Sequence, residues 1–294
     1  MISIAIPIHN YLVVNLVKTI VYQISKIGID YEIICLDDAS TDIEITSQNK
    51  EIQELKNCFY YTNETNLGRT RTRTLLAKKA KFNWILFLDA DVIPMHETFI
   101  SSYISFLNSD SEVIFGGYQY YDFHENRNTV LRWKFGKKRE SQSAEVRDKN
   151  PYSFLFSGNI LIRKNIFLSV QFPDKNYYGM DFFFSYNLHQ KKIKITHIDN
   201  PIYHLGLESN SVFFKKSLEA VENRVHYLAE EQSAQNLNSF LKYYSKLKQY
   251  KLLPIVGFGF KAVEPVLKHF ILSKNPSLFC FDLYRLGYIC HKTS

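Results

Sequence analysis

The chain has 294 residues, of which 46% are hydrophobic and 22% are charged, and its net charge is +7. These proportions are those of a globular protein with a substantial core, and they exclude a disordered or low-complexity chain. The four cysteines lack metal-ligand spacing and no apolar run approaches the roughly 18 residues that span a bilayer, which excludes a zinc module and a transmembrane protein.

Strands and helices alternate in the first third of the chain. Short apolar runs predict strands at 2–7, 31–36 and 59–61 and in a run that ends at Asp89. Helices are predicted at 12–26, after residue 42 and at 68–81. This alternation predicts an α/β fold with a doubly wound, mostly parallel sheet flanked by helices.

The second half of the chain is mixed. One strand is expected at 113–123, with a bend at Gly116-Gly117, and a mobile loop at 134–150, which lacks apolar periodicity. The remaining predicted elements are strands at 154–162, 192–197 and 201–204 and helices at 182–191 and 211–234. We therefore expect one α/β domain over 1–210 and a helical, basic extension over 211–294.

The segment from Asn83 to Asp91 ends an apolar run in two carboxylates. Such a run suits a strand buried on both faces, and residues two apart in an extended chain point the same way. Asp89 and Asp91 can therefore converge at the carboxyl edge of the sheet and hold a hard divalent cation that also binds phosphate oxygens. In the alternative, Asp91 caps a helix that starts near Pro94.

Two further clusters follow predicted strands. Asp37-Asp38 can accept hydrogen bonds from a base N–H or ribose hydroxyls, or cap the next helix. Between Asn66 and Arg73, three arginines lie near a helix start, and Arg69 and Arg73 share a helix face. Guanidinium groups at a helix N-terminus favour a diphosphate or carboxylate site, although a solvated basic face has the same pattern.

Two single side chains complete the candidate set. Asp181 precedes an apolar helix and is either its N-cap or a carboxylate exposed at a cleft and able to act as a general base. His204 ends a short predicted strand, where it is either a structural histidine or a nitrogen ligand for the cation of the aspartate pair.

Positive charge is concentrated at the C-terminal end. Residues 236–294 hold nine Lys and Arg against two acids, so their net charge of +7 equals that of the whole chain. Bulky apolar residues alternate with the basic ones, which is typical of docking on an anionic leaflet and also of a helical appendage with a solvated basic face. We expect no nucleic-acid partner. Met1-Ile2-Ser3-Ile4 has no signal-peptide character, so we expect a cytoplasmic protein, peripheral on the inner face of the membrane if the extension docks there.

The order of these motifs resembles that of the family 2 inverting glycosyltransferases of GT-A fold, across roughly residues 1–210. The matching segments are Ile6-Pro7-Ile8-His9-Asn10, Asp37-Asp38-Ala39-Ser40-Thr41-Asp42, Asn66-Leu67-Gly68 with Arg73, Asp89-Ala90-Asp91, Ser157-Gly158-Asn159-Ile160-Leu161-Ile162-Arg163 and Gly179-Met180-Asp181. The resemblance implies nucleotide-sugar binding by residues 1–110 and an acceptor side at 111–210.

The resemblance also implies a donor site for a nucleotide-sugar, usually a UDP-sugar. Pro7 and Asp38 would line the base and ribose pocket, and His9 would stack on the base where the family usually has Tyr. Arg73 would contact the base or the diphosphate. The full implied donor set is Pro7, His9, Asp38, Asn66, Gly68, Arg73 and Asp89.

For the reaction, the resemblance implies that Asp89 and Asp91 hold the ribose and the Mg²⁺ or Mn²⁺ on the diphosphate, with His204 as a further metal ligand. Asp181 would deprotonate the acceptor hydroxyl of a glycan, a lipid-linked glycan or a similar acceptor, and transfer would invert the anomeric carbon. Met180 departs from the Glu that the family commonly has, which changes the expected acceptor contacts.

Two other classes of protein share parts of this pattern. A non-catalytic nucleotide-sugar-binding or membrane-docking protein would bind UDP without turnover. A sugar-phosphate nucleotidyltransferase would carry a Gly-rich phosphate loop after its first strand, and residues 6–11 contain no glycine. For a transferase, we expect the 134–150 segment to close over the donor.

Overall fold

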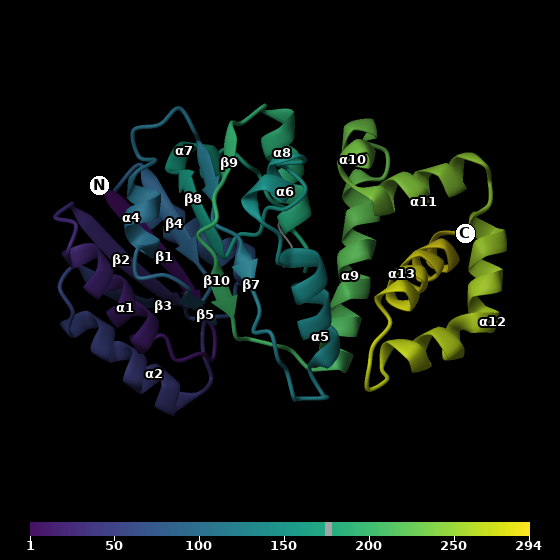
Figure 1. The fold of residues 1–294 in the computed structure, drawn as a ribbon, viewed down its shortest axis with the longest axis horizontal. Helices are drawn as coiled ribbons and strands as arrows, with labels where there is room; N and C mark the ends of the chain where they lie inside the picture. Colours follow the sequence, from purple (N-terminus) through teal and green to yellow (C-terminus); the bar gives the residue numbers. More distant parts are fainter. Residues whose placement is uncertain (174–177) are drawn as a thin grey trace. The chain divides into compact units, whose positions relative to one another are not determined.

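The computed structural model describes residues 1–173 and 178–294, and strands between residues 2 and 197 form a seven-stranded sheet of order β3-β2-β1-β4-β8-β6-β9 (Figure 1). The first four strands are parallel: β1 (Ile2–Ile8), β2 (Tyr31–Asp37), β3 (Cys58–Thr62) and β4 (Trp84–Leu88). The helices between them are α1 (Val14–Ser25), α2 (Ile43–Asn49), the 3-10 helix η1 (Lys50–Glu54) and α3 (Arg69–Lys79). The predicted α/β alternation is confirmed, and every residue of β4 is buried, as expected for a strand covered on both faces.

Three later strands complete this sheet, and three more form a second one. β8 (Asn159–Arg163) is antiparallel to both β4 and β6 (Val113–Phe115), and β9 (Ile195–His197) is parallel to β6. The second sheet has the order β5-β10-β7 and consists of β5 (Val92–Pro94), β10 (Ile202–His204) and β7 (Tyr118–Gln119). Short helices α4 (Phe99–Ile104) and α7 (Lys164–Leu168) follow β5 and β8.

The single strand expected at 113–123 is wrong. The chain turns at Gly116-Gly117, where Gly117 has a φ of +92°, and the residues on either side enter different sheets as β6 and β7. The glycine pair predicts the bend, but no sequence pattern indicates that the chain passes from the seven-stranded sheet to the three-stranded sheet there.

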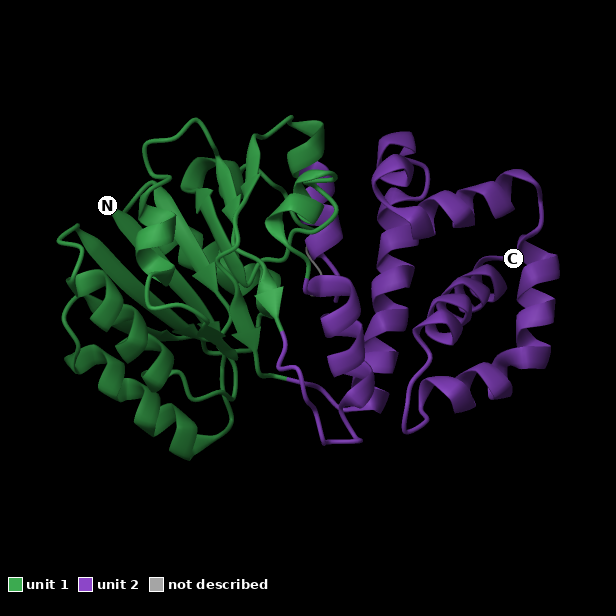
Figure 2. Ribbon diagram, viewed as in Figure 1, with its two compact units in different colours: residues 1–119, 142–176, 188–206 green, residues 120–141, 177–187, 207–294 purple. Residues whose placement is uncertain are grey.

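The described residues divide into two compact units (Figure 2). Unit 1 comprises residues 1–119, 142–176 and 188–206 and contains both sheets. Unit 2 comprises 120–141, 177–187 and 207–294. The expected division at residue 210 lies close to the last of these boundaries, but two internal segments group with the C-terminal helices.

Unit 2 is helical. Its helices are α5 (Val130–Phe135), the first seven residues of α8 (Asp181–Gln190), α9 (Asn210–Leu228), α10 (Gln232–Leu237), α11 (Ser239–Gln249), α12 (Leu253–Ile271) and α13 (Leu278–Thr293). Phe213 of α9, Phe260 of α12 and Phe281 of α13 meet in one buried aromatic cluster. Within 1–173 and 178–294, no helix has both the length and the apolar character needed to cross a bilayer.

The mobile loop expected at 134–150 is also wrong. These residues form the end of α5, the π-helix η2 (Gly136–Glu140) and α6 (Ala144–Asp148). Arg147 is buried in unit 1, where its guanidinium donates to the carbonyl oxygens of Gln142 (2.6 Å) and Ile198 (2.7 Å). The polar composition suggested solvation, but this side chain forms buried hydrogen bonds instead.

Candidate functional site

The loops after β1 and β2 lie at the carboxyl edge of the parallel strands and are tied together. Asn10, which has a φ of +50°, accepts hydrogen bonds at Oδ1 from the N–H groups of Thr41 (2.8 Å) and Asp42 (3.1 Å). Its own N–H donates to Ser40 Oγ at 2.7 Å. These hydrogen bonds hold the two loops together at the edge where open α/β sheets bind ligands.

Asp38 is buried and holds the loop that leads into α3. Its carboxylate accepts from the N–H groups of Leu67 (2.9 Å) and Gly68 (2.7 Å) and from Asn63 Nδ2 (2.8 Å). Because a carboxylate has about four acceptor positions, about one is left for a ligand. The N-cap of α2 is Asp42, so the capping alternative for the Asp37-Asp38 pair is wrong.

His9 lies exposed beside this loop. Its Nδ1 is 3.0 Å from the carbonyl oxygen of Asp38 and 3.3 Å from Nδ2 of Asn66. The structure therefore brings His9, Asp38, Asn66 and Gly68 together, as the motif order predicted. Pro7, near the end of β1, is half-buried.

Asp89 follows β4 and pairs with two arginines of α3. Its Oδ1 accepts from Arg73 and its Oδ2 from Arg69, and the Tyr118 hydroxyl donates to Oδ2 at 3.4 Å. Only 3% of the Arg73 side chain is exposed, whereas 50% of the Arg69 side chain is exposed. Arg73 therefore fixes Asp89 inside the protein, and Arg69 is the arginine with surface left to meet a ligand.

Gly158 allows Asp89 to take this position. The N–H of Asp89 donates to the Gly158 carbonyl at 3.1 Å. A Cβ at residue 158 would lie 2.1 Å from Asp89 Oδ2 and 2.2 Å from the Tyr118 hydroxyl oxygen, which is closer than non-bonded atoms approach. The glycine of the Ser157-Gly158-Asn159 motif is therefore required by the close contact with Asp89.

Asp91 pairs with His204 at the end of β10. His204 Nε2 lies 3.4 Å from Asp91 Oδ2, and the Asp91 carbonyl accepts from the Leu205 N–H at 2.8 Å. Burial favours a raised pKa for Asp91, but its hydrogen bond to His204 and the charges of His204 and Arg69 outweigh burial and lower this pKa to about 2. Asp91 is therefore an anion throughout the neutral range.

Asp89 and Asp91 pair with different elements. Ala90 and Asp91 form a turn between β4 and β5, so Asp89 meets α3 while Asp91 meets β10. In the described part of the chain, no three His, Cys, Asp or Glu side chains form a group that could hold a metal ion. The alternative in which Asp91 caps a helix near Pro94 is wrong, because residues 92–94 form β5.

Asp181 is the first residue of α8, in unit 2. The turn before it is fastened to α9, because the Tyr178 N–H donates to Glu219 Oε1 (2.9 Å) and Asn223 Nδ2 donates to the Tyr178 carbonyl (3.0 Å). Met180 is buried, so the position at which the resemblance leads one to expect Glu packs in the interior here. Asp181 itself is half-buried.

Tyr118 also belongs to the site, although no sequence motif predicts it. Its hydroxyl reaches Asp89, and its ring centroid lies 6.0 Å from that of His204, so it links the two halves of the site. Tyr118 is placed by the pairing of β7 with β10, where it lies opposite Ile202. A pairing over such a long stretch of chain leaves no local pattern that could have identified this tyrosine.

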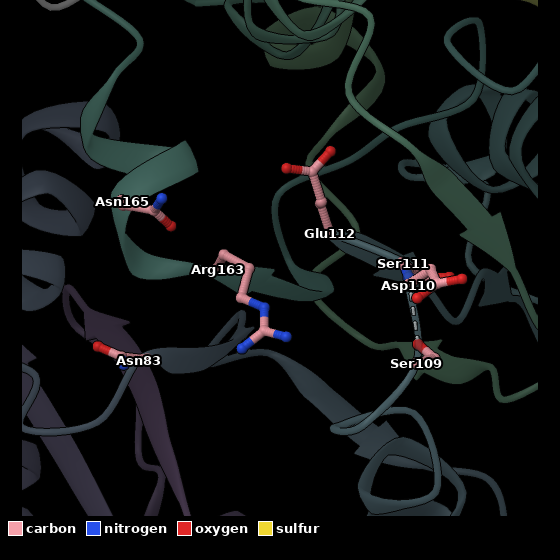
Figure 3. A pocket seen from close by; sticks show the side chains of 7 residues that line it. All are labelled: Asn83, Ser109, Asp110, Ser111, Glu112, Arg163 and Asn165. Atoms are coloured by element: carbon pink, nitrogen blue, oxygen red, sulfur yellow. Dashed lines mark hydrogen bonds between the residues drawn. The ribbon is translucent and has the colours of Figure 1, made fainter.

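A pocket of about 670 Å³ lies at the opposite edge of the main sheet (Figure 3). Asn83 precedes β4, Glu112 precedes β6, and Arg163 ends the antiparallel β8. Figure 3 shows the lining side chains spread around the pocket: Asn83, Ser109, Asp110, Ser111, Glu112, Arg163 and Asn165. None of the predicted site residues lines it.

The chain resembles several solved structures over most of its length. Residues 1–349 of TarS from S. aureus, also solved with UDP-GlcNAc, align with 100% of this chain and 92% of that chain, at 16% identity and a TM-score of 0.54. The mannosyltransferase PcManGT from Pyrobaculum calidifontis, in complex with GDP-Man and Mn²⁺, aligns with 99% of this chain and 87% of its own, at 10% identity and a TM-score of 0.62.

Glucosyl-3-phosphoglycerate synthase from Mycobacterium tuberculosis, in complex with Mn²⁺, UDP and glucosyl-3-phosphoglycerate, aligns with 77% of this chain and 79% of its own, at 16% identity and a TM-score of 0.54. At these identities the likeness shows the fold, and it confirms the GT-A architecture. A comparison with curated protein sequences gives no match. The family model of Glycosyl transferase family 2 matches residues 3–170, more than half of the chain. The chain therefore belongs to glycosyl transferase family 2.

Proposed function

We propose that this protein is a metal-dependent, inverting glycosyltransferase that moves a sugar from a UDP-sugar to a hydroxyl of a glycan or lipid-linked glycan. The observation that carries the proposal is the pairing of Asp91 with His204 at the carboxyl edge of the sheet, beside the Asp89–Arg69 ion pair. This arrangement offers a cation site and a cationic group side by side, which suits a diphosphate bridged by a metal ion.

Asp91 and His204 are the residues that would hold Mg²⁺ or Mn²⁺. Ligand atoms about 2.1 Å from a cation and at right angles to each other lie about 3 Å apart, and Asp91 Oδ2 and His204 Nε2 are 3.4 Å apart. Mg²⁺ is commonly bound by one or two protein side chains, with substrate phosphates filling further positions. The bound cation would neutralise the charge that develops on the departing diphosphate.

Arg69 and His9 have the exposure that donor contacts need. Half of the Arg69 side chain is accessible, so its guanidinium can bind diphosphate oxygens while still paired with Asp89. The exposed ring of His9 can stack on the base. Buried Asp38 and Arg73 serve mainly to hold the Asn66–Gly68 loop and Asp89 in place.

Asp181 would act as the general base of the transfer. It accepts the proton of the acceptor hydroxyl as that oxygen forms a bond to the anomeric carbon and the bond from that carbon to the diphosphate breaks. Attack on the face opposite the leaving group inverts the anomeric configuration. The fastening of the Tyr178 turn to α9 supports this role, because a base must be held in a fixed position.

Calorimetric titration with UDP, GDP and dTDP, each with and without Mn²⁺, tests the donor half of the proposal. GDP is included because the similar solved structures hold both uridine and guanosine donors, and dTDP tests whether the base alone is recognised. We expect UDP binding that requires Mn²⁺ and weakens about a hundredfold in Asp91→Ala, because even outer-shell partners of metal sites contribute about 10–100-fold. Asp110→Ala, at the opposite edge of the sheet, is the matched control and should bind as wild type does.

A transfer assay then separates an enzyme from a nucleotide-binding protein. Asp91→Asn should lower metal-dependent turnover of the UDP-sugar by about two to three decades. Binding of none of the three nucleotides, or UDP binding that ignores both Mn²⁺ and Asp91, would overturn the proposal. UDP binding with no turnover of any donor would leave a binding protein instead.

A further inference from the structure

We propose that one side of α12 binds the surface of an anionic lipid bilayer. This side consists of Ile255, Phe258, Ala262, Val266 and Phe270, here called the apolar face. They are three or four residues apart, so they follow one side of the helix on either side of Pro265, which lies between Ala262 and Val266. All five are exposed, with 68% of Ile255 and 83% of Phe258 accessible to solvent.

The apolar face is not needed to build unit 2. The core of this unit uses other residues of α12, namely Leu253, Phe260 and Ile271, which are buried. Figure 1 shows α12 at the edge of unit 2, with α13 on its inner side. A row of apolar side chains that are exposed and lie outside the core indicates a surface that another apolar phase covers.

The charges around the apolar face identify its partner. Lys251, Lys261, Lys268 and Lys274 are exposed along α12 and just beyond its ends. The acid within the helix, Glu264, is paired with Lys261 at 3.0 Å and accepts from the Tyr284 hydroxyl at 2.8 Å. Bulky apolar residues flanked by lysines are the pattern of helices that lie in the plane of an anionic membrane interface.

Charge complementarity favours lipid over a second copy of the chain. A symmetric dimer through the apolar face would place the same lysines of two copies against each other, because a two-fold contact uses one surface twice. An anionic leaflet would attract those lysines. The inference is independent of the proposed transfer reaction, and it would keep a cytoplasmic protein at the inner face of the membrane.

Vesicle co-sedimentation tests the proposal with the full chain. Vesicles of equal parts phosphatidylglycerol and phosphatidylcholine are compared with vesicles of phosphatidylcholine alone, at low and high salt. We expect binding to the anionic vesicles, little to the neutral ones, and weaker binding at high salt. The double variant Ile255→Ser/Phe258→Ser should lower the partition coefficient about tenfold or more, because both side chains lose apolar contact with the lipid.

Matched variants separate the contribution of apolar contact from the contribution of lysine charge to vesicle binding. Ile43→Ser removes an isoleucine that is 84% exposed in unit 1, so it should leave vesicle binding unchanged. Lys261→Gln/Lys268→Gln should weaken binding to anionic vesicles several-fold, whereas Lys18→Gln/Lys56→Gln, on exposed lysines of unit 1, should not. Since all substituted side chains are exposed, each variant should keep the wild-type melting temperature.

Three outcomes would overturn the proposal. They are failure to bind anionic vesicles, equal binding to neutral and anionic vesicles, and unchanged binding in Ile255→Ser/Phe258→Ser. Light scattering without lipid tests self-association directly. If wild type is a dimer and Phe258→Ser restores the monomer, a second copy rather than lipid covers the apolar face. A loss of UDP binding has no bearing on this experiment, so the two proposals fail separately.

Discussion

Asp89 and Asp91 are two residues apart, but their carboxylates have different partners. Both oxygens of Asp89 accept from arginines, one of which is buried with it, so the position of Asp89 is fixed by a buried ion pair. Asp91 has His204, an imidazole that can exchange a hydrogen bond for a metal bond. We infer that Asp91 is the direct cation ligand, while Asp89 holds Arg69 in place for the diphosphate.

The lowered pKa of Asp91 predicts how acid affects stability. Its folded pKa lies near 2, below the ordinary value of 3.8, so ionised Asp91 stabilises the folded state above about pH 4, and this contribution is lost as the pH falls towards 2. Asp91→Asn should therefore be less stable than wild type by about 2 kcal/mol at pH 6 and should approach wild type near pH 2. Urea unfolding of both proteins across this range measures the difference. A gap that stays constant with pH would contradict the assigned pairing.

Asp181 permits a test in which binding and turnover separate. Asp181→Asn keeps the shape of the side chain but accepts a proton poorly, so turnover should fall by about two to four decades. UDP affinity in the presence of Mn²⁺ should stay within about twofold of wild type, because the proposed donor contacts are all in unit 1. Steady-state kinetics and titration on one preparation give both values. Loss of UDP binding in this variant would show that Asp181 is not the base.

At the scale of elements, the sequence predicted what is local and missed what depends on distant pairing. β1, β2 and β4 are apolar runs buried by helices on both sides, so composition was enough to find them. β10 was predicted at 201–204, but β5 and β7, with three and two residues, lie on either side of β10 and depend on pairing with it. A two-residue strand such as β7 carries no periodicity of its own, so Tyr118 could not be assigned to the site from sequence.

The same distinction applies to the site. Asp38 and Asn66 were predicted at one edge because they follow parallel strands, the family resemblance added His9, and the structure brings the three together. The convergence of Asp89 and Asp91 was predicted from an extended backbone, and the turn at residues 90 and 91 removes that premise. Arg147 misled in the opposite way, because its own side chain is buried and hydrogen-bonded although most of the polar segment around it is exposed.

Gly158 provides a prediction at the scale of elements. It directly precedes β8, and its carbonyl accepts a hydrogen bond from the N–H of Asp89, the residue after β4. Gly158→Ala would place a methyl group 2.1 Å from Asp89 Oδ2, so Asp89 must shift and its pairing with Arg69 is disturbed. We expect a loss of about 1–3 kcal/mol of stability, as for overpacked sites, together with weaker UDP binding. Thermal unfolding and titration measure the two effects. Gly259→Ala is the matched control: nothing lies within 4 Å of its added Cβ, and alanine in a helix should stabilise slightly.

At the scale of the whole molecule, the two units are interleaved along the chain. Unit 2 consists of three segments, and the two internal ones, 120–141 and 177–187, lie within the range that sequence analysis gave to the α/β domain. Their apolar side chains have partners beyond residue 210. Leu131 packs with Phe213 and Phe214, and Phe182 and Tyr186 pack in a cluster with Leu228, Ala234 and Leu241.

A fragment that ends at residue 210 should therefore be less ordered than the same residues in the full chain. Leu131, Phe182 and Tyr186 would lose their apolar partners, and each buried side chain of this size contributes about 1.5–3 kcal/mol. Limited proteolysis should cut the fragment first within 120–141 and 177–187, at sites that stay protected in the full chain. Equal protection of these segments in the fragment and the full chain would show that residues 1–210 fold as one independent domain. Preferential cutting would show that the C-terminal helices complete the helical unit that carries Asp181. The position of the proposed base would then depend on residues more than thirty positions away in the sequence.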